Sequence, residues 1–283
     1  MEFDKNKVLG LGFSAQVFLG TFNGKDVAVK RIEKSVGLNL DKAAQELEEK
    51  TMKNLDHPNV LKLLHVQDDN DFKYLILELC VGTIANYVNG TYKGEMPSEI
   101  EGMIQMASGL QYIHSKHFVH RDIKPANVLI SSTFVLKISD FGLSRTVTTT
   151  SGSFAMTSGP KGTRVYYSPE FLFTEGKTKE EKEQIRVNVS IDVFSLGCLF
   201  FNYLTKGGHP FANGGRPNEV LTPASIQKGE KVLDGEMGLP KNHYAYAMIE
   251  GMTEKILEDR WKLEKVLETL NAKAKSAQTE EIQ

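Results

Sequence analysis

Residues 120–142 read HRDIKPANVLISSTFVLKISDFG and place four polar side chains within one short span: Asp122, Lys124, Asn127 and Asp140. The apolar runs 128–130 and 135–138 inside this span predict two strands. Pairing of these strands would bring the loops beside them together, so that the four polar groups meet at one point. Two acids, a base and an amide in one place suit phosphoryl transfer, because the protein contributes mainly positioning and charge neutralisation to that reaction.

The composition is that of a globular protein: 283 residues, of which 40% are hydrophobic and 25% charged. This length fits one large two-lobed domain or two ordinary domains. A formal net charge of −2 offers no general attraction to nucleic acid or to acidic membranes. Cys80 and Cys198 lie in apolar runs and indicate neither a disulfide framework nor a zinc site, so a reducing, cytoplasmic compartment is the expectation.

No stretch of the sequence indicates membrane insertion. Residues 1–10 are charged and lack the apolar core of a signal peptide. The longest apolar run, 193–204, is interrupted by Ser195 and Asn202 and is too short to span a bilayer. We therefore expect a buried helix there and no membrane segment in this chain.

Residues 7–32 alternate apolar and polar residues around glycines and predict three antiparallel strands. The first turn carries Gly10 and Gly12, which would let backbone amides approach phosphate oxygens. Ala15 replaces the third glycine of a GxGxxG pattern, so a plain hairpin is an equally good interpretation of this turn alone.

Strand and helix signals alternate over the next part of the chain. Asn23-Gly24 is a strong hairpin signal between two of the predicted strands. Residues 40–55 have helical spacing, residues 72–80 form an apolar strand, and helical spacing returns from Ser98 onward.

HRDIKPAN at 120–127 followed by DFG at 140–142 resembles the catalytic loop and the metal loop of eukaryotic-type protein kinases. The resemblance implies an α+β, two-lobed kinase fold, with a small antiparallel-sheet N-lobe over residues 1–80 and a mainly helical C-lobe over 81–270. Residues 271–283 are expected to form a polar tail, since so short a segment cannot build a further domain.

The same resemblance implies ATP and Mg²⁺ as cofactors and a protein hydroxyl as substrate. Asp122 would accept or orient the hydroxyl proton, and Lys124 would neutralise charge on the transferred group. Asn127 and Asp140 would supply oxygens to magnesium, a hard cation that prefers oxygen ligands. His120 is expected to be a packed structural histidine rather than a base.

Lys30 follows Val27-Ala28-Val29 in a strand and matches the kinase lysine that holds the α- and β-phosphates. Its expected partner is a helical glutamate, for which Glu46, Glu48 and Glu49 are available. Glu48 fits best, because it lies nine residues before His57, as in kinases.

Further nucleotide-binding positions follow from the resemblance. Val17 and Ala28 would form the roof of an adenine slot, and the backbone groups of Glu78 and Cys80 would bond the adenine edge. Together with Lys30, the expected ATP-binding residues are Leu9, Gly10, Gly12, Val17, Ala28, Glu78, Cys80 and Leu129.

The segment 140–170 is rich in hydroxyl side chains and poor in apolar ones. It is a flexible surface loop, an activation loop that becomes ordered when a phosphate meets Arg121, or both. Thr163 together with Lys124 is the pairing found in serine/threonine kinases rather than in tyrosine kinases. The sequence does not show which hydroxyl is modified.

Three features lie in the second half of the chain. Asp192, at the head of an apolar helix, either caps that helix or holds the backbone of the catalytic loop, as the matching aspartate does in kinases. Arg260 would pair with Glu170 across the large lobe, although Trp261 stands where proline is usual in kinases. The charge run 174–186 is most simply a solvated insert.

Five further stretches narrow the resemblance: GTFNG at 20–24, ELC at 78–80, ISDFGL at 138–143, SIDVFS at 190–195 and LTKGGHPF at 204–211. With them the chain is similar to the kinase part of the endoplasmic-reticulum stress sensors, the inositol-requiring kinase/endoribonucleases of the unfolded protein response. We expect either an excised kinase domain that faces the cytosol in its parent protein or a stand-alone relative.

Two functions of different classes follow from this resemblance. The first is an active serine/threonine kinase that phosphorylates protein hydroxyls, including those of its own activation loop. The second is a nucleotide-operated module whose output is a homodimer interface, which the family and Ala15 both suggest. Ribonuclease activity and direct nucleic-acid binding are not expected, because no segment is available to form a ribonuclease domain.

Overall fold

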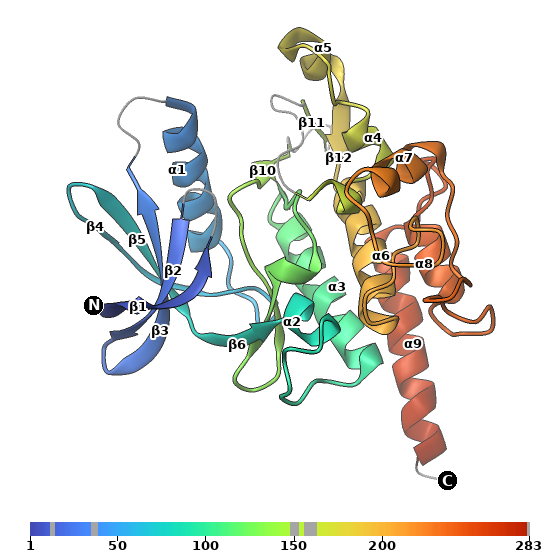
Figure 1. Ribbon diagram of the computed structural model, residues 1–283, viewed down its shortest axis with the longest axis horizontal. Coiled ribbons are helices and arrows are strands. Elements are labelled where there is room, and N and C mark those ends of the chain that lie inside the picture. Colours follow the sequence, from blue (N-terminus) through green and yellow to red (C-terminus); the bar gives the residue numbers. More distant parts are fainter. Residues whose placement is uncertain (12–14, 35–38, 148–152, 156–162, 282–283) are drawn as a thin grey trace.

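The computed structural model describes residues 1–11, 15–34, 39–147, 153–155 and 163–281, so Gly12 of the glycine turn lies outside the described residues. Two lobes lie side by side in Figure 1: a sheet with one helix at the N-terminal end, and a mainly helical body after it. The expected α+β, two-lobed architecture is therefore confirmed.

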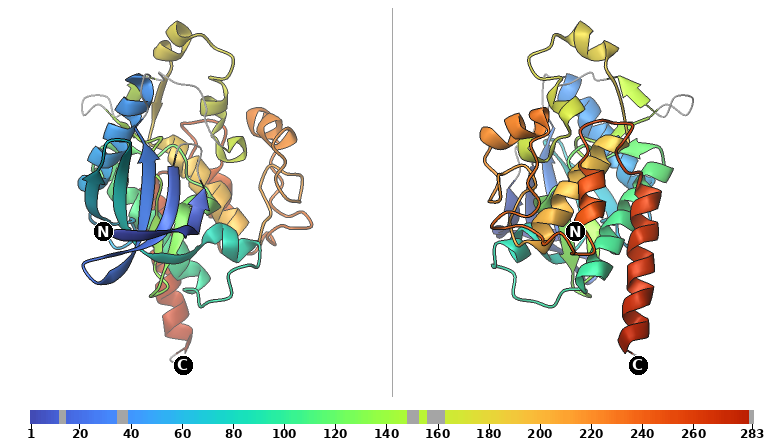
Figure 2. Two further views of the ribbon diagram at one scale, coloured as in Figure 1. Left: turned by 60° about the vertical axis from the view of Figure 1, so that its left-hand side comes forward. Right: turned by 90° about the vertical axis from the view of Figure 1, so that its right-hand side faces the viewer.

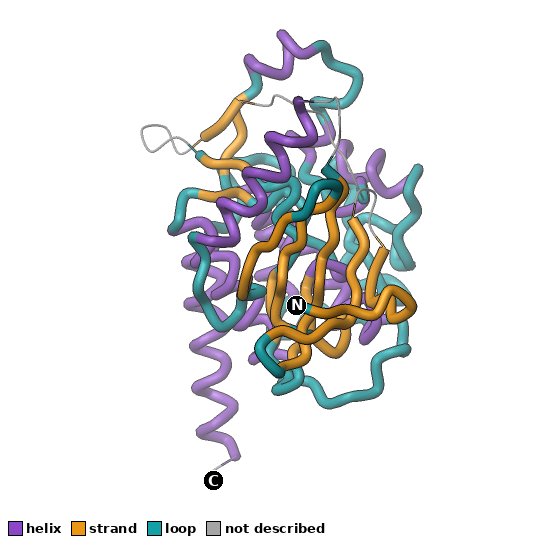
Figure 3. Tube along the Cα trace, turned by 90° about the vertical axis from the view of Figure 1, so that its left-hand side faces the viewer, coloured by secondary structure: helices purple, strands orange, loops and turns teal. Residues whose placement is uncertain are grey.

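The N-lobe is built on a five-stranded antiparallel sheet with the strand order β1-β2-β3-β5-β4 (Figure 3). The strands are β1 (Glu2–Leu11), β2 (Ala15–Phe22), β3 (Lys25–Glu33), β4 (Leu63–Asp68) and β5 (Phe72–Glu78). Between β2 and β3, Asn23 and Gly24 have φ angles of 51° and 74°. A type I′ hairpin turn requires positive φ at both positions, which explains why Asn-Gly forms it.

One helix, α1 (Asn39–Lys53), packs against this sheet. Two ion pairs connect the helix to the sheet: Lys30 of β3 with Glu48, and Lys73 of β5 with Glu49. The helix predicted for residues 40–55 is thus present, and Glu48 and Glu49 form ion pairs with lysines of two different strands.

The chain leaves the N-lobe sheet after Glu78 and enters a three-stranded sheet at Cys80. This sheet has the order β6-β8-β9 and consists of β6 (Cys80–Thr83), β8 (Val128–Ser131) and β9 (Leu136–Ile138). The two strands predicted within 120–142 are present and pair antiparallel. The loop before β8 and the loop after β9 therefore emerge at the same end of the hairpin.

The rest of the C-lobe is mainly helical and surrounds α6 (Ser190–Leu204) (Figure 2). The residues of α6 from Ile191 to Tyr203 are all buried. The buried helix predicted for residues 193–204 is confirmed. The other helices are α2 (Ile84–Val88), α3 (Glu99–Ser115), α4 (Pro169–Leu172), α5 (Lys179–Gln184), α7 (Leu221–Lys228), α8 (Tyr246–Met252) and α9 (Leu263–Glu281), with single 3-10 turns η1 (Pro125–Asn127) and η2 (Arg164–Tyr166).

Two peripheral features complete the C-lobe. The segment 271–281, expected as a polar tail, continues α9, whose last turns project beyond the body of the lobe (Figure 2). The charge run 174–186 contains α5, which protrudes at the top of Figure 1, and leads into a small ribbon in which β12 (Arg186–Asn188) pairs with β11 (Ser153–Ala155). A second short pair joins β7 (Phe118–Val119) to β10 (Arg145–Thr146). Within the described residues, no helix has the length and apolar character needed to cross a bilayer.

Candidate active site

Lys30 lies between two carboxylates that come from different parts of the chain. Its Nζ is 2.5 Å from Oε1 of Glu48 and 3.4 Å from Oδ1 of Asp140. Of the three glutamates considered from the sequence, Glu48 forms this pair, whereas Glu49 binds Lys53 and Lys73. A strand, a helix and the DFG loop thus meet at one amine.

The charges of this group support one another. Burial alone would lower the pKa of Lys30, but the carboxylates of Glu48 and Asp140 outweigh burial and raise this pKa above its usual value. The charge of Lys30 is also the main cause that lowers the pKa of Asp140. At neutral pH the site therefore presents a fixed ammonium beside an ionised carboxylate whose side chain is about half exposed, at 49%.

Asp122 is held by both of its expected neighbours. Nζ of Lys124 lies 3.0 and 2.8 Å from the two carboxylate oxygens, and Nδ2 of Asn127 donates to Oδ2 and to the backbone carbonyl of Asp122, each at 2.8 Å. Burial raises the pKa of the Asp122 carboxyl above its usual value, against the opposing charge of Lys124. This direction suits a group that must accept or orient a proton.

The donor atoms of Asn127 and Asp140 fit magnesium. Because the amide nitrogen of Asn127 is used by Asp122, its Oδ1 is the atom left for a cation. Asp140 supplies an ionised carboxylate, and Mg²⁺ takes oxygen ligands, commonly one or two from protein and the rest from phosphates and water. Among the residues that the structure describes, no cluster of three or more His, Cys, Asp or Glu side chains is placed to hold a metal alone.

Asp192 of α6 fixes the catalytic loop from behind. It is fully buried, and its two oxygens accept hydrogen bonds from the backbone amides of His120 and Arg121 at 2.8 and 2.7 Å. Nε2 of His114 lies 2.9 Å from the same carboxylate. The N-cap of α6 is Val189, so the interpretation of Asp192 as a simple helix cap is wrong and the loop-holding role is the observed one.

These contacts hold the backbone in an unusual conformation. Arg121 and Asp140 have φ angles of 71° and 65°, in a region that costs a residue other than glycine about 1–3 kcal/mol. The ring of His120, fully buried, lies 2.9 Å from the carbonyl oxygen of Ser139 and packs edge-on against Phe141. His120 is thus a packing residue between the two loops, as expected.

The side chain of Arg121 is buried in the C-lobe, with its guanidinium 5.1 Å from the centre of the Phe171 ring. Burial, followed by the charge of Arg145, lowers the pKa of Arg121 to about 10. Thr163 is half-buried and directly precedes η2. The hydroxyl-rich residues 148–152 and 156–162 lie outside the described residues.

Apart from Gly12, which lies outside the described residues, the expected nucleotide-binding residues lie on the strands of both sheets. In the N-lobe, Gly10 of β1 is paired with Val17 of β2, and Ala28 of β3 is paired with Leu77 of β5. In the C-lobe sheet, Cys80 is partly buried, and burial raises the pKa of its thiol to about 12. Leu9 is half exposed on β1, and Leu129 is partly buried on β8.

The long-range pair expected in the C-lobe is also present. Arg260 contacts both oxygens of Glu170, at 2.6 and 3.0 Å, and donates to the carbonyl of Ser190. Trp261 does not disturb this arrangement, because its ring packs over Gly251, where a β-carbon would approach it to 2.2 Å. The tryptophan in place of proline is accommodated by a glycine on α8.

Two positions near the site were not singled out from the sequence. Arg145 lies close enough to Arg121 to affect its pKa. Lys137 of β9 lies 3.0 Å from a carboxylate oxygen of Glu78. Lys137 carries a weak sequence signal, since it is the one charged residue in the predicted strand 135–138, but nothing in the sequence indicates its partner.

Comparisons with known proteins agree with this geometry. The family model of the protein kinase domain matches residues 3–270. The serine/threonine-protein kinase/endoribonuclease ire-1 of Caenorhabditis elegans is 32% identical over 83% of this chain and 23% of its own length. The human serine/threonine-protein kinase/endoribonuclease IRE2 is 34% identical over 79% of this chain and 24% of its own length.

A further relative, the probable serine/threonine-protein kinase irlD of Dictyostelium discoideum, is 30% identical over 92% of this chain and 17% of its own length. The chain thus spans about a quarter or less of the length of these curated relatives. The resemblance drawn from the motifs is confirmed, since the matched residues 3–270 include the ion pair of Lys30 and the whole span 120–142: this chain belongs to the protein kinase domain family.

Proposed function

We propose that this chain is an active serine/threonine kinase that transfers the γ-phosphate of ATP to protein hydroxyls. The observation that carries this proposal is the double contact of Lys30, with Glu48 at 2.5 Å and with Asp140 at 3.4 Å, beside an Asp122 held by Lys124 and Asn127. These contacts support the proposal, because phosphoryl transfer depends on positioned charged groups and oxygen ligands that lie close together.

Each side chain has a defined task in the proposed reaction. Lys30, fixed by Glu48, binds the α- and β-phosphates, and the backbone at Glu78 and Cys80 bonds adenine. Asp122 orients the substrate hydroxyl and accepts its proton, while Lys124 neutralises charge on the transferred group. Asn127 and Asp140 hold Mg²⁺, which neutralises charge on the phosphate oxygens.

The proposed substrates include a second copy of this chain. The hydroxyl-rich stretch 146–158 lies in the segment that leads from the DFG loop to Thr163. As the resemblance implies, a phosphate in this stretch would pair with Arg121, and its negative charge would relieve the repulsion between Arg121 and Arg145. Serine/threonine specificity is supported by Thr163 with Lys124 and by the relatives, which are named as serine/threonine-protein kinases.

The test is a labelling assay with γ-labelled ATP on the wild type and on the Asp122→Asn variant. The exchange keeps the shape of the side chain but removes its ability to accept a proton, so labelling should fall by about 10²-fold or more. A mass-spectrometric map of the phosphates would identify the modified hydroxyls. Equal incorporation in the two proteins would refute the proposed activity.

A second candidate function is a nucleotide-operated homodimerisation module. It is favoured by Ala15 in the phosphate turn and by the two-activity names of the relatives, which pair a kinase with another output. In this case ATP analogues would shift self-association in analytical ultracentrifugation, while neither the protein nor an added substrate would become labelled.

A further inference from the structure

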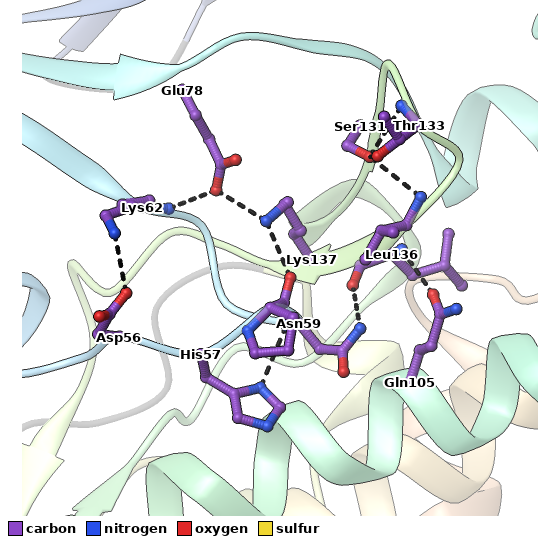
Figure 4. Close-up of polar contacts among 12 residues, drawn as sticks. Asp56, His57, Asn59, Lys62, Glu78, Gln105, Ser131, Thr133, Leu136 and Lys137 are labelled. Atoms are coloured by element: carbon purple, nitrogen blue, oxygen red, sulfur yellow. Dashed lines mark hydrogen bonds and ion pairs between the residues drawn. The ribbon is translucent and has the colours of Figure 1, made fainter.

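Glu78 is the last residue of the N-lobe sheet, and its side chain reaches toward the C-lobe. Its Oε1 accepts a hydrogen bond from the backbone amide of Lys62 at 2.7 Å and lies 3.0 Å from Nζ of Lys137 (Figure 4). The amide of Glu78 in turn donates to the carbonyl of Lys62 at 3.1 Å. Glu78, whose backbone is proposed to bond adenine, is therefore held through both its main chain and its side chain.

Lys137 comes from the strand that leads into the DFG loop, three residues before Asp140. Its two neighbours in sequence are buried, so its side chain lies on the other face of β9. On that face it stands directly opposite Leu129 of β8, one of the residues expected to bind ATP. Nζ of Lys137 also donates to the carbonyl of Pro58 at 2.8 Å.

The turn at residues 57–62 is itself fixed to β9 by backbone contacts. The amide of Ile138 donates to the carbonyl of Asn59, and the amide of Leu61 donates to the carbonyl of Ile138, each at 2.9 Å. The side-chain amide of Asn59 donates to the carbonyl of Leu136 at 3.0 Å (Figure 4). The turn and β9 therefore form one unit. The backbone of Lys62 and the side chain of Lys137 both join this unit to Glu78, the first residue of the hinge, which is the segment 78–80 between the two sheets.

We propose that Lys137 is a positioning residue for the nucleotide: through the Glu78 carboxylate it holds the hinge backbone at a set place relative to Asp140. The inference rests on the proposed function, because it requires that adenine binds at Glu78 and Cys80 and that the phosphates lie beside Asp140. In this proposal adenine binds at residues 78–80 and the phosphates bind between Lys30 and Asp140, so a tie between Glu78 and β9 sets the distance that the nucleotide must bridge.

The tie is assembled together with the active arrangement. The same structure contains the contacts of Lys30 with Glu48 and Asp140 and has Phe141 buried against His120. The ion pair of Lys137 with Glu78 thus coexists with these contacts in one arrangement, and we expect its loss to weaken nucleotide binding.

A neighbouring ion pair offers a matched control. The Lys62 side chain lies 3.0 Å from Asp56, the residue just before the same turn, but these side chains are 55% and 81% exposed. The side chains of Lys137 and Glu78 are 12% and 25% exposed, so their interaction is much less screened by water. The control substitution Lys62→Met removes a charge from the same network and leaves the backbone contact of Lys62 with Glu78 in place.

The experiment compares the wild type with Lys137→Met, Lys137→Arg and Lys62→Met. Methionine keeps the length and the apolar stem of lysine but not its charge, and arginine keeps the charge. For each protein we would measure the Kd for MgADP by calorimetry, KM for ATP and kcat in the labelling assay, and the melting temperature without ligand.

We expect Lys137→Met to raise the Kd for MgADP and KM for ATP about fivefold, the equivalent of about 1 kcal/mol, with kcat changed less than about twofold. For Lys137→Arg and Lys62→Met, the Kd for MgADP and KM for ATP should stay within about twofold of the wild-type values. In a Glu78→Met background, Lys137→Met should have little further effect on the Kd for MgADP, because the side chain at position 78 then offers no oxygen to Lys137.

Two results would overturn the positioning role in a wild type that binds MgADP: unchanged or tighter nucleotide binding by Lys137→Met, or a fall in melting temperature and kcat with KM unaltered. Absence of any MgADP binding by the wild type would instead refute the proposed function, and the positioning role with it.

Discussion

Replacing Asp192 by asparagine should loosen the catalytic loop from the core of the C-lobe. The carboxylate accepts hydrogen bonds from the backbone amides of His120 and Arg121 and lies beside Nε2 of His114, all within 2.9 Å. It is fully buried. An asparagine offers only one oxygen, so its NH₂ group must face one of the donating amides. Hydrogen bonds to a charged group contribute about 1.5–3 kcal/mol each, and a buried unpaired donor adds its own cost.

We therefore expect Asp192→Asn to lower the free energy of unfolding by about 3 kcal/mol, which corresponds to a fall in melting temperature of about 6–10 °C for a chain of this size. Labelling by γ-labelled ATP should fall by at least about tenfold, because Arg121 would relax from its left-handed conformation and displace Asp122. The Asp56→Asn variant, at an exposed ion pair, should remain within about 0.5 kcal/mol of the wild type.

The pH dependence of this effect has a definite sign. Burial alone would raise the pKa of Asp192, but its contacts with His114, His120 and Arg121 outweigh burial and hold the pKa below its ordinary value. A lowered carboxyl pKa stabilises the folded state above the unfolded value of about 4, and this stabilisation is lost as the pH falls further. The difference between wild type and Asp192→Asn should thus be present at pH 7 and shrink below about pH 4. A melting temperature within 1 °C of the wild type at pH 7, with full labelling, would refute the reasoning.

Three other substitutions test the fold around the site. Gly109→Ala places a β-carbon 2.5 Å from the carbonyl oxygen of Asn59, so it should destabilise the protein by about 1–3 kcal/mol in urea unfolding; no change would show that the turn can shift freely. Arg260→Met removes a fully buried guanidinium from Glu170 and should cost about 3 kcal/mol, measured by the urea midpoint, with an effect under 1 kcal/mol contradicting it. Burial lowers the pKa of His209 to about 3, so the free energy of unfolding should not depend on this histidine above pH 6.5 and should fall by up to about 1.4 kcal/mol per pH unit below it. In urea unfolding, the free energy of His209→Gln should fall less steeply than that of the wild type between pH 6.5 and 5. Equal pH dependence of the two proteins would exclude this histidine as the cause.

Much of the catalytic region could be predicted from local patterns. The span 120–142 contains its own two strands, and the side chains it carries are brought together by the hairpin that those strands form. The Asn23-Gly24 turn and the buried helix at 193–204 were also predictable, because turn chemistry and apolar periodicity act over a few residues.

The choice of Glu48 shows that sequence spacing could also predict one contact between distant residues. Three glutamates lie within four residues, and helix geometry alone sends them in different directions. Spacing from His57 favoured Glu48, and the structure pairs it with Lys30, while Glu49 turns toward Lys73. The spacing carried this information because helix α1 and the turn after it form one continuous local unit.

The amino-acid sequence thus dictated the element types, the order of the motifs and the chemistry available along 120–142. Tertiary structure decided which distant groups meet: Asp192 with the amides of His120 and Arg121, and Lys137 with Glu78. Such contacts depend on how whole lobes pack, and a charge on a strand has no local preference for a partner about sixty residues away. For that reason the hinge tie became visible only in the folded chain.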